Sequence, residues 1–175
     1  MFQSQFFRFI PVATVFVIVL GLTSSPVRAD ALTDTVTQYS RCAGAMNSIA
    51  EHQDDPTARA KYTQASSILE SMGRLYGTMG DLDDLVAMDA VDEGRREITS
   101  IIMAKDGKSH QAFMKPCLEV IKNLPAHERE SVSASAALTD LENGDTAKAE
   151  AFLADYPQSP LASHVQIKLE NEKKP

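Results

Sequence analysis

Histidine and methionine are the residue types in this sequence that could hold a metal ion. The four histidines, His52, His110, His127 and His164, fall in separate predicted elements. None is spaced from another histidine or from a glutamate as zinc or di-iron ligands are. His110 and Met114 stand one helical turn apart, a spacing that a soft-metal carrier such as a copper handler could use. We therefore expect no resident metal and keep metal carriage as an alternative.

The sequence motifs of the common enzyme classes are absent. The chain has no GxSxG, no HExxH, no glycine-rich phosphate loop, and no CxxC or CxxCH pair. Catalytic groups need only meet in space, but nothing in the sequence indicates that any carboxylates converge in a cleft. The sequence therefore predicts no catalytic residues, no cofactor and no enzyme activity.

Six acidic residues fall between Asp81 and Glu93, a density that raises the question of a calcium loop. Such a loop needs alternating oxygen ligands, a central glycine and a closing glutamate, whereas Leu85 and Val86 stand at ligand positions here. Carboxylates at the start of a helix are stabilised by the positive end of its dipole. We interpret this run as the start of a helix.

The first 29 residues have the pattern of a secretory signal peptide. Arg8 precedes an apolar run from Phe9 to about Leu22, and the triplet 27–29 fits a small-residue cleavage site before Asp30. A membrane anchor is the competing interpretation, but the apolar run is shorter than the ~20 residues that cross a bilayer. No cysteine directly follows the cleavage region, so a lipid anchor is unsupported. We expect a periplasmic mature chain, residues 30–175, with no membrane span.

Loss of Arg8 and Arg28 with that segment makes the mature chain strongly acidic. Of 17 basic residues 15 remain, against 24 acidic residues, which gives a net charge of −9. This charge repels phosphate backbones and anionic lipid headgroups, so it argues against binding to nucleic acid or to a membrane surface. Cationic and neutral partners remain open.

The two cysteines, Cys42 and Cys117, gain meaning from the export signal. An exported chain with two cysteines has a single possible intramolecular pairing, and oxidising compartments favour it. We predict a disulfide that closes a loop of 75 residues and that stabilises the fold by roughly 4 kcal/mol through chain entropy. Reactive or metal-binding thiols are the alternative.

Apolar residues recur at helical spacing along the mature chain. One such stripe predicts a helix from about Leu32 to His52, and Asp55 and Pro56 fit the N-cap and first position of the next helix. In that second helix, which we expect to end at Gly80, the stripe predicts a buried seam. The seam consists of Ala58, Tyr62, Ala65, Leu69, Met72, Tyr76 and Met79.

A second row of the same helix, Ser66, Gly73, Gly77 and Gly80, carries almost no side chain. Glycine inside a helix costs roughly 1 kcal/mol relative to alanine, so something should offset that cost. We interpret the row as the place where a neighbouring helix approaches closely or where the helix bends. A ligand groove with a floor of bare backbone is the alternative.

Two further predicted helices complete a first unit, residues 30–125. The third begins near Asp81, with Gly94 as a candidate break, and Ser109 is the expected cap of the fourth. Pro116 predicts a kink or a later start of that fourth helix, and Pro125 is expected to close the unit.

The last third of the chain resembles a known helical repeat. The segments LENGD (141–145), KAEAFL (148–153) and YPQSPLA (156–162) are similar to one and a half tetratricopeptide-type repeats. The variant is that of periplasmic cell-envelope proteins such as the Tol-Pal accessory protein and outer-membrane assembly lipoproteins. The match covers about 40 residues and departs from the family at Thr146, where an aromatic residue is usual. It implies a tetratricopeptide-like helical hairpin with a polar tail over residues 126–175.

The predicted fold is therefore all-α: a disulfide-linked helical bundle with a C-terminal tetratricopeptide-like hairpin. Because repeat hairpins hold peptides or partner helices, the resemblance implies a protein-binding adaptor or accessory factor of the cell envelope. Its partner would be another periplasmic or envelope protein, bound through Phe152, Tyr156 and Leu161. An inhibitor or immunity protein against a secreted toxin is one alternative, suggested by small size, export and acidity. A small-molecule or metal carrier, suggested by the glycine row and the methionines, is another.

Overall fold

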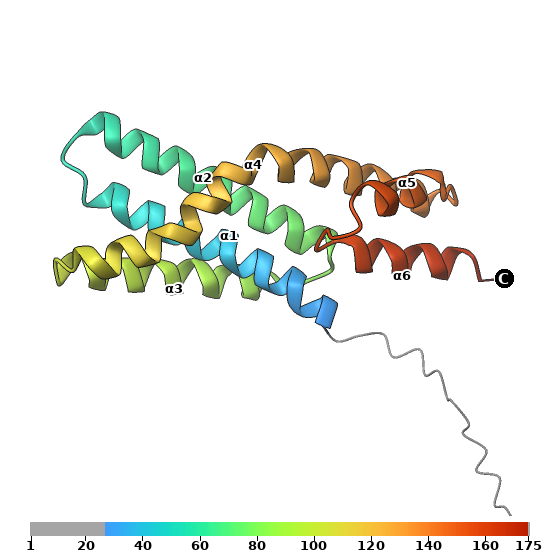
Figure 1. Cartoon of the computed structure of the whole chain (residues 1–175), viewed down its shortest axis with the longest axis horizontal. Helices are drawn as coiled ribbons and strands as arrows, with labels where there is room; N and C mark the ends of the chain where they lie inside the picture. Colours follow the sequence, from blue (N-terminus) through green and yellow to red (C-terminus); the bar gives the residue numbers. More distant parts are fainter. Residues whose placement is uncertain (1–26, 175) are drawn as a thin grey trace, which may run out of the picture.

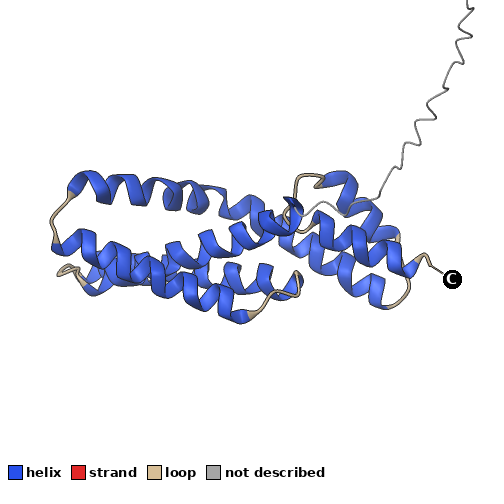
Figure 2. Ribbon diagram, turned by 90° about the horizontal axis from the view of Figure 1, so that it is seen from below, coloured by secondary structure: helices blue, strands red, loops and turns tan. Residues whose placement is uncertain are grey.

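Six helices joined by short loops make up residues 27–174, the part of the chain that the computed structural model describes (Figure 1). Within these residues there is no strand, as Figure 2 also shows, so the predicted all-α class is confirmed. None of these helices combines the length and the apolar composition that crossing a membrane requires. The predicted signal peptide, except for its last three residues, lies outside the described residues. The helices are α1 (Val27–Glu51), α2 (Pro56–Met79), α3 (Asp84–Met103), α4 (Gly107–Glu142), α5 (Ala147–Asp155) and α6 (Ala162–Glu172).

Helix α1 is the centre of a long bundle and lies between α2 and α3 (Figure 1). Its side chains from Tyr39 to Ala50 are almost all buried, on every side of the helix. Small residues such as Ala43 and Ala45 allow the two neighbouring helices to approach closely. A helix that is buried on all sides is the expected core element of a bundle.

The glycine-rich row of α2 faces α1. A Cβ atom placed on Gly73 would lie 2.7 Å from the Ser40 hydroxyl oxygen, closer than side chains normally come. In the same row, the Ser66 hydroxyl donates a hydrogen bond of 2.9 Å to the Ala43 carbonyl oxygen of α1. These contacts support the interpretation of the row as a helix–helix contact and not as the floor of a ligand groove.

Two further glycines, Gly44 of α1 and Gly94 of α3, each lie against the backbone of the other helix. A Cβ atom on Gly44 would lie 1.9 Å from the Val91 carbonyl oxygen, and one on Gly94 would lie 2.0 Å from the Arg41 carbonyl oxygen. The helices therefore cross with their backbones in contact, which only glycine allows. The expected break at Gly94 is wrong, because α3 is continuous through it.

Aspartate side chains cap the starts of α2, α3 and α4. Asp55 and Pro56 begin α2 as predicted, with the Asp55 carboxylate accepting a backbone N–H at 2.9 Å. Helix α4 is capped by Asp106 and not by Ser109. The Asp106 carboxylate accepts two backbone N–H groups at 3.1 Å, and Ser109 donates its own hydroxyl to the same carboxylate at 2.6 Å. One carboxylate can satisfy several unpaired N–H groups at a helix start. This explains why α4 begins at Gly107, before the predicted cap Ser109.

Helix α4 runs without interruption through both Pro116 and Pro125. Figure 1 shows it changing direction between its yellow and orange parts. A proline removes one helical hydrogen bond and bends the helix, but packing on both sides of it can preserve the helix. Here Val120 is buried before Pro125 and Ala134 is buried after it. The expected boundary at residue 125 therefore falls inside one helix, which both units share.

Helices α5 and α6 pack against the second half of α4, beyond the end of the other three helices (Figure 1). The turn into α5 contains Gly144, whose φ of 78° lies in the left-handed region that favours glycine. Buried residues of this end, Phe152 and Val165 among them, belong to the same continuous core as Tyr39 and Tyr76 of the bundle. The C-terminal helices thus share one core with the rest of the chain.

Candidate functional site

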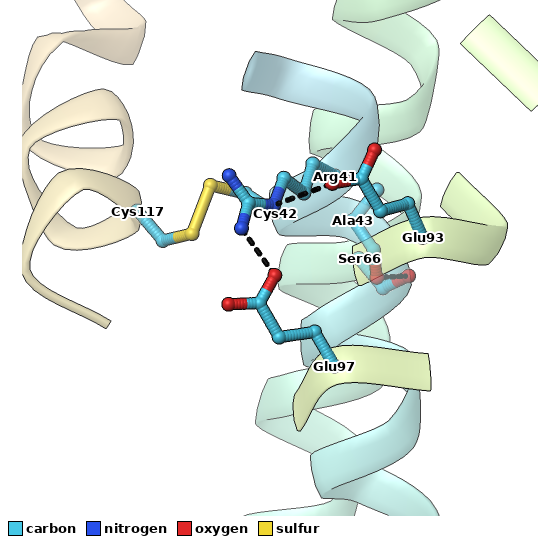
Figure 3. The surroundings of a disulfide bond; sticks show 7 residues. All are labelled: Arg41, Cys42, Ala43, Ser66, Glu93, Glu97 and Cys117. Atoms are coloured by element: carbon cyan, nitrogen blue, oxygen red, sulfur yellow. Dashed lines mark hydrogen bonds and ion pairs between the residues drawn. A yellow bond between two sulfur atoms is a disulfide. The ribbon is translucent and has the colours of Figure 1, made fainter. Parts of the chain in front are cut away.

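The predicted disulfide between Cys42 and Cys117 is present and joins α1 to α4, with the Cα atoms 5.4 Å apart. Each cysteine is only 2% exposed. Figure 3 shows the Arg41 side chain next to this link, paired with Glu97 of α3. The Arg41 guanidinium also lies 5.1 Å from the ring centre of Phe113. The disulfide and these Arg41 contacts fasten three helices at one point.

A hollow of about 910 Å³ opens beside the disulfide, between α1, α3 and α4. Both polar and apolar residues line this hollow. Two of them, Arg41 and Glu97, form an ion pair with each other. The disulfide sulfurs are not free to react as thiolates. We therefore interpret this hollow as a structural feature and not as a reactive site.

A larger hollow of about 1040 Å³ lies between the N-terminal halves of α2 and α4, and we call it the α2–α4 groove. In Figure 1 the first half of α4 begins beside α3, apart from the N-terminal half of α2, and approaches α2 only farther along the chain. Tyr62 and Ala65, predicted in the buried seam, are therefore only half-buried. Leu118 of the opposite wall is 57% exposed. The apolar lining of the groove consists of Met46, Ala58, Tyr62, Ala65, Ala112, Met114, Leu118 and Ile121.

The rim of the α2–α4 groove is basic, in contrast to the chain as a whole. Lys61 belongs to the α2 wall, and Lys108 and Lys115 belong to the α4 wall. None of these three lysines forms an ion pair with another described residue. The groove therefore combines an exposed apolar floor with positive charges that have no internal partner.

A partly buried polar cluster joins the bundle to the C-terminal helices. The Tyr39 hydroxyl forms a hydrogen bond with Nδ1 of His127 in α4. The Tyr76 hydroxyl donates to the Glu130 carboxylate at 3.1 Å, and the Ser159 hydroxyl donates to the same oxygen at 2.5 Å. These residues come from α1, α2, α4 and the loop before α6. Because the members of the cluster satisfy one another, we interpret it as a structural fastening and not as an acid–base site.

The two buried tyrosines predict a loss of stability at alkaline pH. Burial, assisted by the negative charge of Glu130, raises the pKa of Tyr39 and of Tyr76 far above the ordinary value of 10.0. In the unfolded chain both ionise near pH 10, so the unfolded state loses protons there that the folded state keeps. The free energy of unfolding should therefore fall as the pH rises through 10.0, with a slope that approaches roughly 1.4 kcal/mol per pH unit for each tyrosine above that pH.

Urea unfolding of wild type and of the Tyr39→Phe/Tyr76→Phe variant, at intervals from about pH 8 to about pH 11, measures this effect. The variant lacks both titrating groups, so its stability should decline less steeply than that of the wild type. Equal slopes for the two proteins would contradict the assignment of the effect to these tyrosines.

The C-terminal residues predicted to bind a partner lie mostly inside the protein. Phe152 and Leu161 are each 0% exposed and belong to the core. Tyr156 is half-buried, and its ring centre lies 5.4 Å from that of Phe152. These side chains stabilise the C-terminal helices, and only Tyr156 keeps part of its surface available.

The histidines do not gather into a metal site. His110 and Met114 both line the α2–α4 groove, but no group of three or more His, Cys, Asp or Glu side chains within residues 27–174 is placed to hold a metal ion. His127 contacts Tyr39, and His164 lies 3.6 Å from the Asp81 carboxylate. Burial lowers the pKa of His164, against the opposing effect of Asp81. These two histidines have structural partners and no metal-ligand geometry.

The chain matches no protein-family model, no curated protein and no solved structure. The geometry of the α2–α4 groove therefore provides the basis for a functional interpretation.

Proposed function

We propose that this protein is an adaptor or accessory factor of the cell envelope that binds another protein through the α2–α4 groove. The observation that supports this proposal most strongly is the apolar floor left open between two helices, with Leu118 57% exposed. Exposed apolar grooves of this kind commonly mark protein-binding sites, and a groove walled by two helices suits a helix of the partner. The signal-peptide pattern and the tetratricopeptide resemblance favour a periplasmic role.

The burial of Phe152 and Leu161 argues against a partner-binding site on the C-terminal helices. Phe152 and Leu161 are buried, so a partner would have to unfold the hairpin to reach them. Leu118, by contrast, could transfer its exposed apolar surface to a partner without any rearrangement. Full burial of a leucine side chain contributes roughly 1.5–3 kcal/mol, which is enough for a central binding residue.

The alternative that the protein carries a small molecule or a metal depended mainly on the glycine row of α2. The glycine row of α2 was its proposed ligand floor, but that row is filled by contacts of Gly73 and Ser66 with α1. The α2–α4 groove lies between two helices, and its apolar lining includes the exposed Leu118.

Leu118→Asp should weaken binding of the partner by about thirtyfold or more, because it places a charge in the apolar centre of the interface. The partner would first be purified from periplasm by co-elution with the tagged protein, identified by mass spectrometry and produced separately. Isothermal titration calorimetry with the pure partner then gives the affinity.

Leu85→Asp is the matched control, since Leu85 of α3 is 58% exposed and lies outside the groove. Both variants should melt within a few degrees of the wild type, because surface substitutions usually change stability by less than about 0.5 kcal/mol. If Leu118→Asp binds as tightly as Leu85→Asp, the groove is not the binding site.

A further inference from the structure

We infer that the partner of the α2–α4 groove presents an amphipathic helix whose apolar stripe is flanked on both sides by carboxylates. This inference rests on the proposed function and adds the chemistry of the partner. It follows from three features of the groove: its lysines have no ion-pair partner among the described residues, its acidic residues do not pair with those lysines, and two of the lysines lie two helical turns apart on α4.

The lysines of the groove differ from many other basic residues of the protein in having no carboxylate beside them. Arg74, Lys148 and Lys173 each lie 2.7–2.9 Å from a carboxylate oxygen of this chain. Lys61 and Lys115 have no such partner among residues 27–174. Charges at the edge of an apolar groove select and orient a partner of opposite charge.

The acidic residues of the groove form no ion pair with these lysines. The Asp55 carboxylate accepts the Thr57 N–H at the start of α2. Glu119 points toward Lys122, with 3.9 Å between the charged atoms. Its three lysines against two carboxylates give the groove a formal charge of 3 − 2 = +1, in a chain whose formal net charge is −7. A partner with basic flanks would meet like charges at both walls.

The spacing of the lysines fits a helix. Lys108 and Lys115 are seven residues apart on α4, which is two turns or about 10.5 Å along the axis. Lys61 stands on the facing wall, and the apolar side chains of Met114 and Leu118 also line the groove. A partner helix lying in the groove would place its apolar stripe on this floor. Acids on its two flanks, spaced three, four or seven residues apart, would reach both walls.

Three synthetic helical peptides of about 18 residues test this inference, titrated calorimetrically into the chain of residues 30–175. The first has a leucine stripe with glutamate flanks, the second the same stripe with lysine flanks, and the third an alanine stripe with glutamate flanks. The first should bind one to one and at least about tenfold more tightly than either of the others.

Charge-reversal variants of the protein test whether the preference for acidic flanks comes from the lysines of the groove. Lys61→Glu/Lys115→Glu should weaken binding of the first peptide by at least about tenfold and should favour the lysine-flanked peptide instead. Arg96→Glu/Arg129→Glu changes the net charge by the same amount at exposed residues outside the groove, and its effect should stay below about threefold. Circular dichroism and thermal melting confirm that both variants fold.

Equal binding of the glutamate-flanked and lysine-flanked peptides would overturn the inference, as would the absence of binding by all three. Equal effects of the two charge-reversal variants would also overturn it. Displacement of the first peptide by laurate at a one-to-one ratio, with no sensitivity to the peptide flanks, would assign the groove to an anionic amphiphile. If the purified partner is sensitive to Leu118→Asp but not to Lys61→Glu/Lys115→Glu, the proposed function stands and this inference falls.

Discussion

Replacing Cys42 and Cys117 with serine should lower the free energy of unfolding by roughly 4 kcal/mol. The disulfide closes a loop of 75 residues, so its loss returns a large amount of conformational freedom to the unfolded chain. It also removes the covalent link between α1 and the first half of α4. Denaturant unfolding of the oxidised wild type and of the double serine variant measures the difference.

Reductant provides the control for this prediction. Dithiothreitol should destabilise the wild type by nearly the same amount and should leave the double serine variant unchanged. Because the two cysteines are buried, the reduced wild type keeps its packing and loses only the covalent link. An unfolding midpoint that is the same with and without reductant, in protein whose thiols titrate as oxidised beforehand, would show that the link contributes no stability.

Gly94→Ala should destabilise the protein by about 2 kcal/mol or more, although alanine is normally the better helix former by roughly 1 kcal/mol. The new Cβ would lie 2.0 Å from the Arg41 carbonyl oxygen, so α1 and α3 would have to separate. The same reasoning applies to Gly44→Ala, whose Cβ would lie 1.9 Å from the Val91 carbonyl oxygen. A backbone carbonyl cannot rotate out of the way as the end of a side chain can.

Gly77→Ala is the matched control in a helix of the same bundle. Its Cβ would lie 3.9 Å from the Val36 side chain, which is ordinary van der Waals contact. The substitution should therefore stabilise the protein by up to about 1 kcal/mol, through the higher helix propensity of alanine. Urea unfolding of the three alanine variants decides the matter, and equal stability of Gly94→Ala and Gly77→Ala would refute the proposed crossing of α1 and α3.

The sequence predicted the helices whose signals are local. Asp55 and Pro56 mark the start of α2 by side-chain chemistry alone, and the seam of α2 follows from periodicity. The course of α4 could not be predicted in the same way. Whether Pro116 and Pro125 end a helix depends on the packing of residues on either side, such as Val120 and Ala134, and that packing comes from distant parts of the chain.

The candidate site shows the same limit. The periodicity that placed Tyr62 in a buried seam identifies an apolar face but not what covers it. Its cover depends on the direction of α4, which lies apart from α2 in this region (Figure 1). Similarly, the aromatic and aliphatic residues of the C-terminal resemblance, Phe152 and Leu161, stand out in the sequence because the core needs them. The basic rim had a visible signal, since Lys108 and Lys115 share a helical face with an exposed leucine.

Site-specific photo-cross-linking in living cells tests most directly whether a partner protein binds in the α2–α4 groove. A photoreactive amino acid would be placed in turn at Leu118 of the α2–α4 groove, at Leu85 of α3 and at Ile167 of α6. These three side chains are 57%, 58% and 54% exposed, so accessibility does not favour any of them. The groove interpretation predicts one discrete cross-linked protein from position 118 that is absent at 85 and 167. The same product from position 167, with none from position 118, would contradict it.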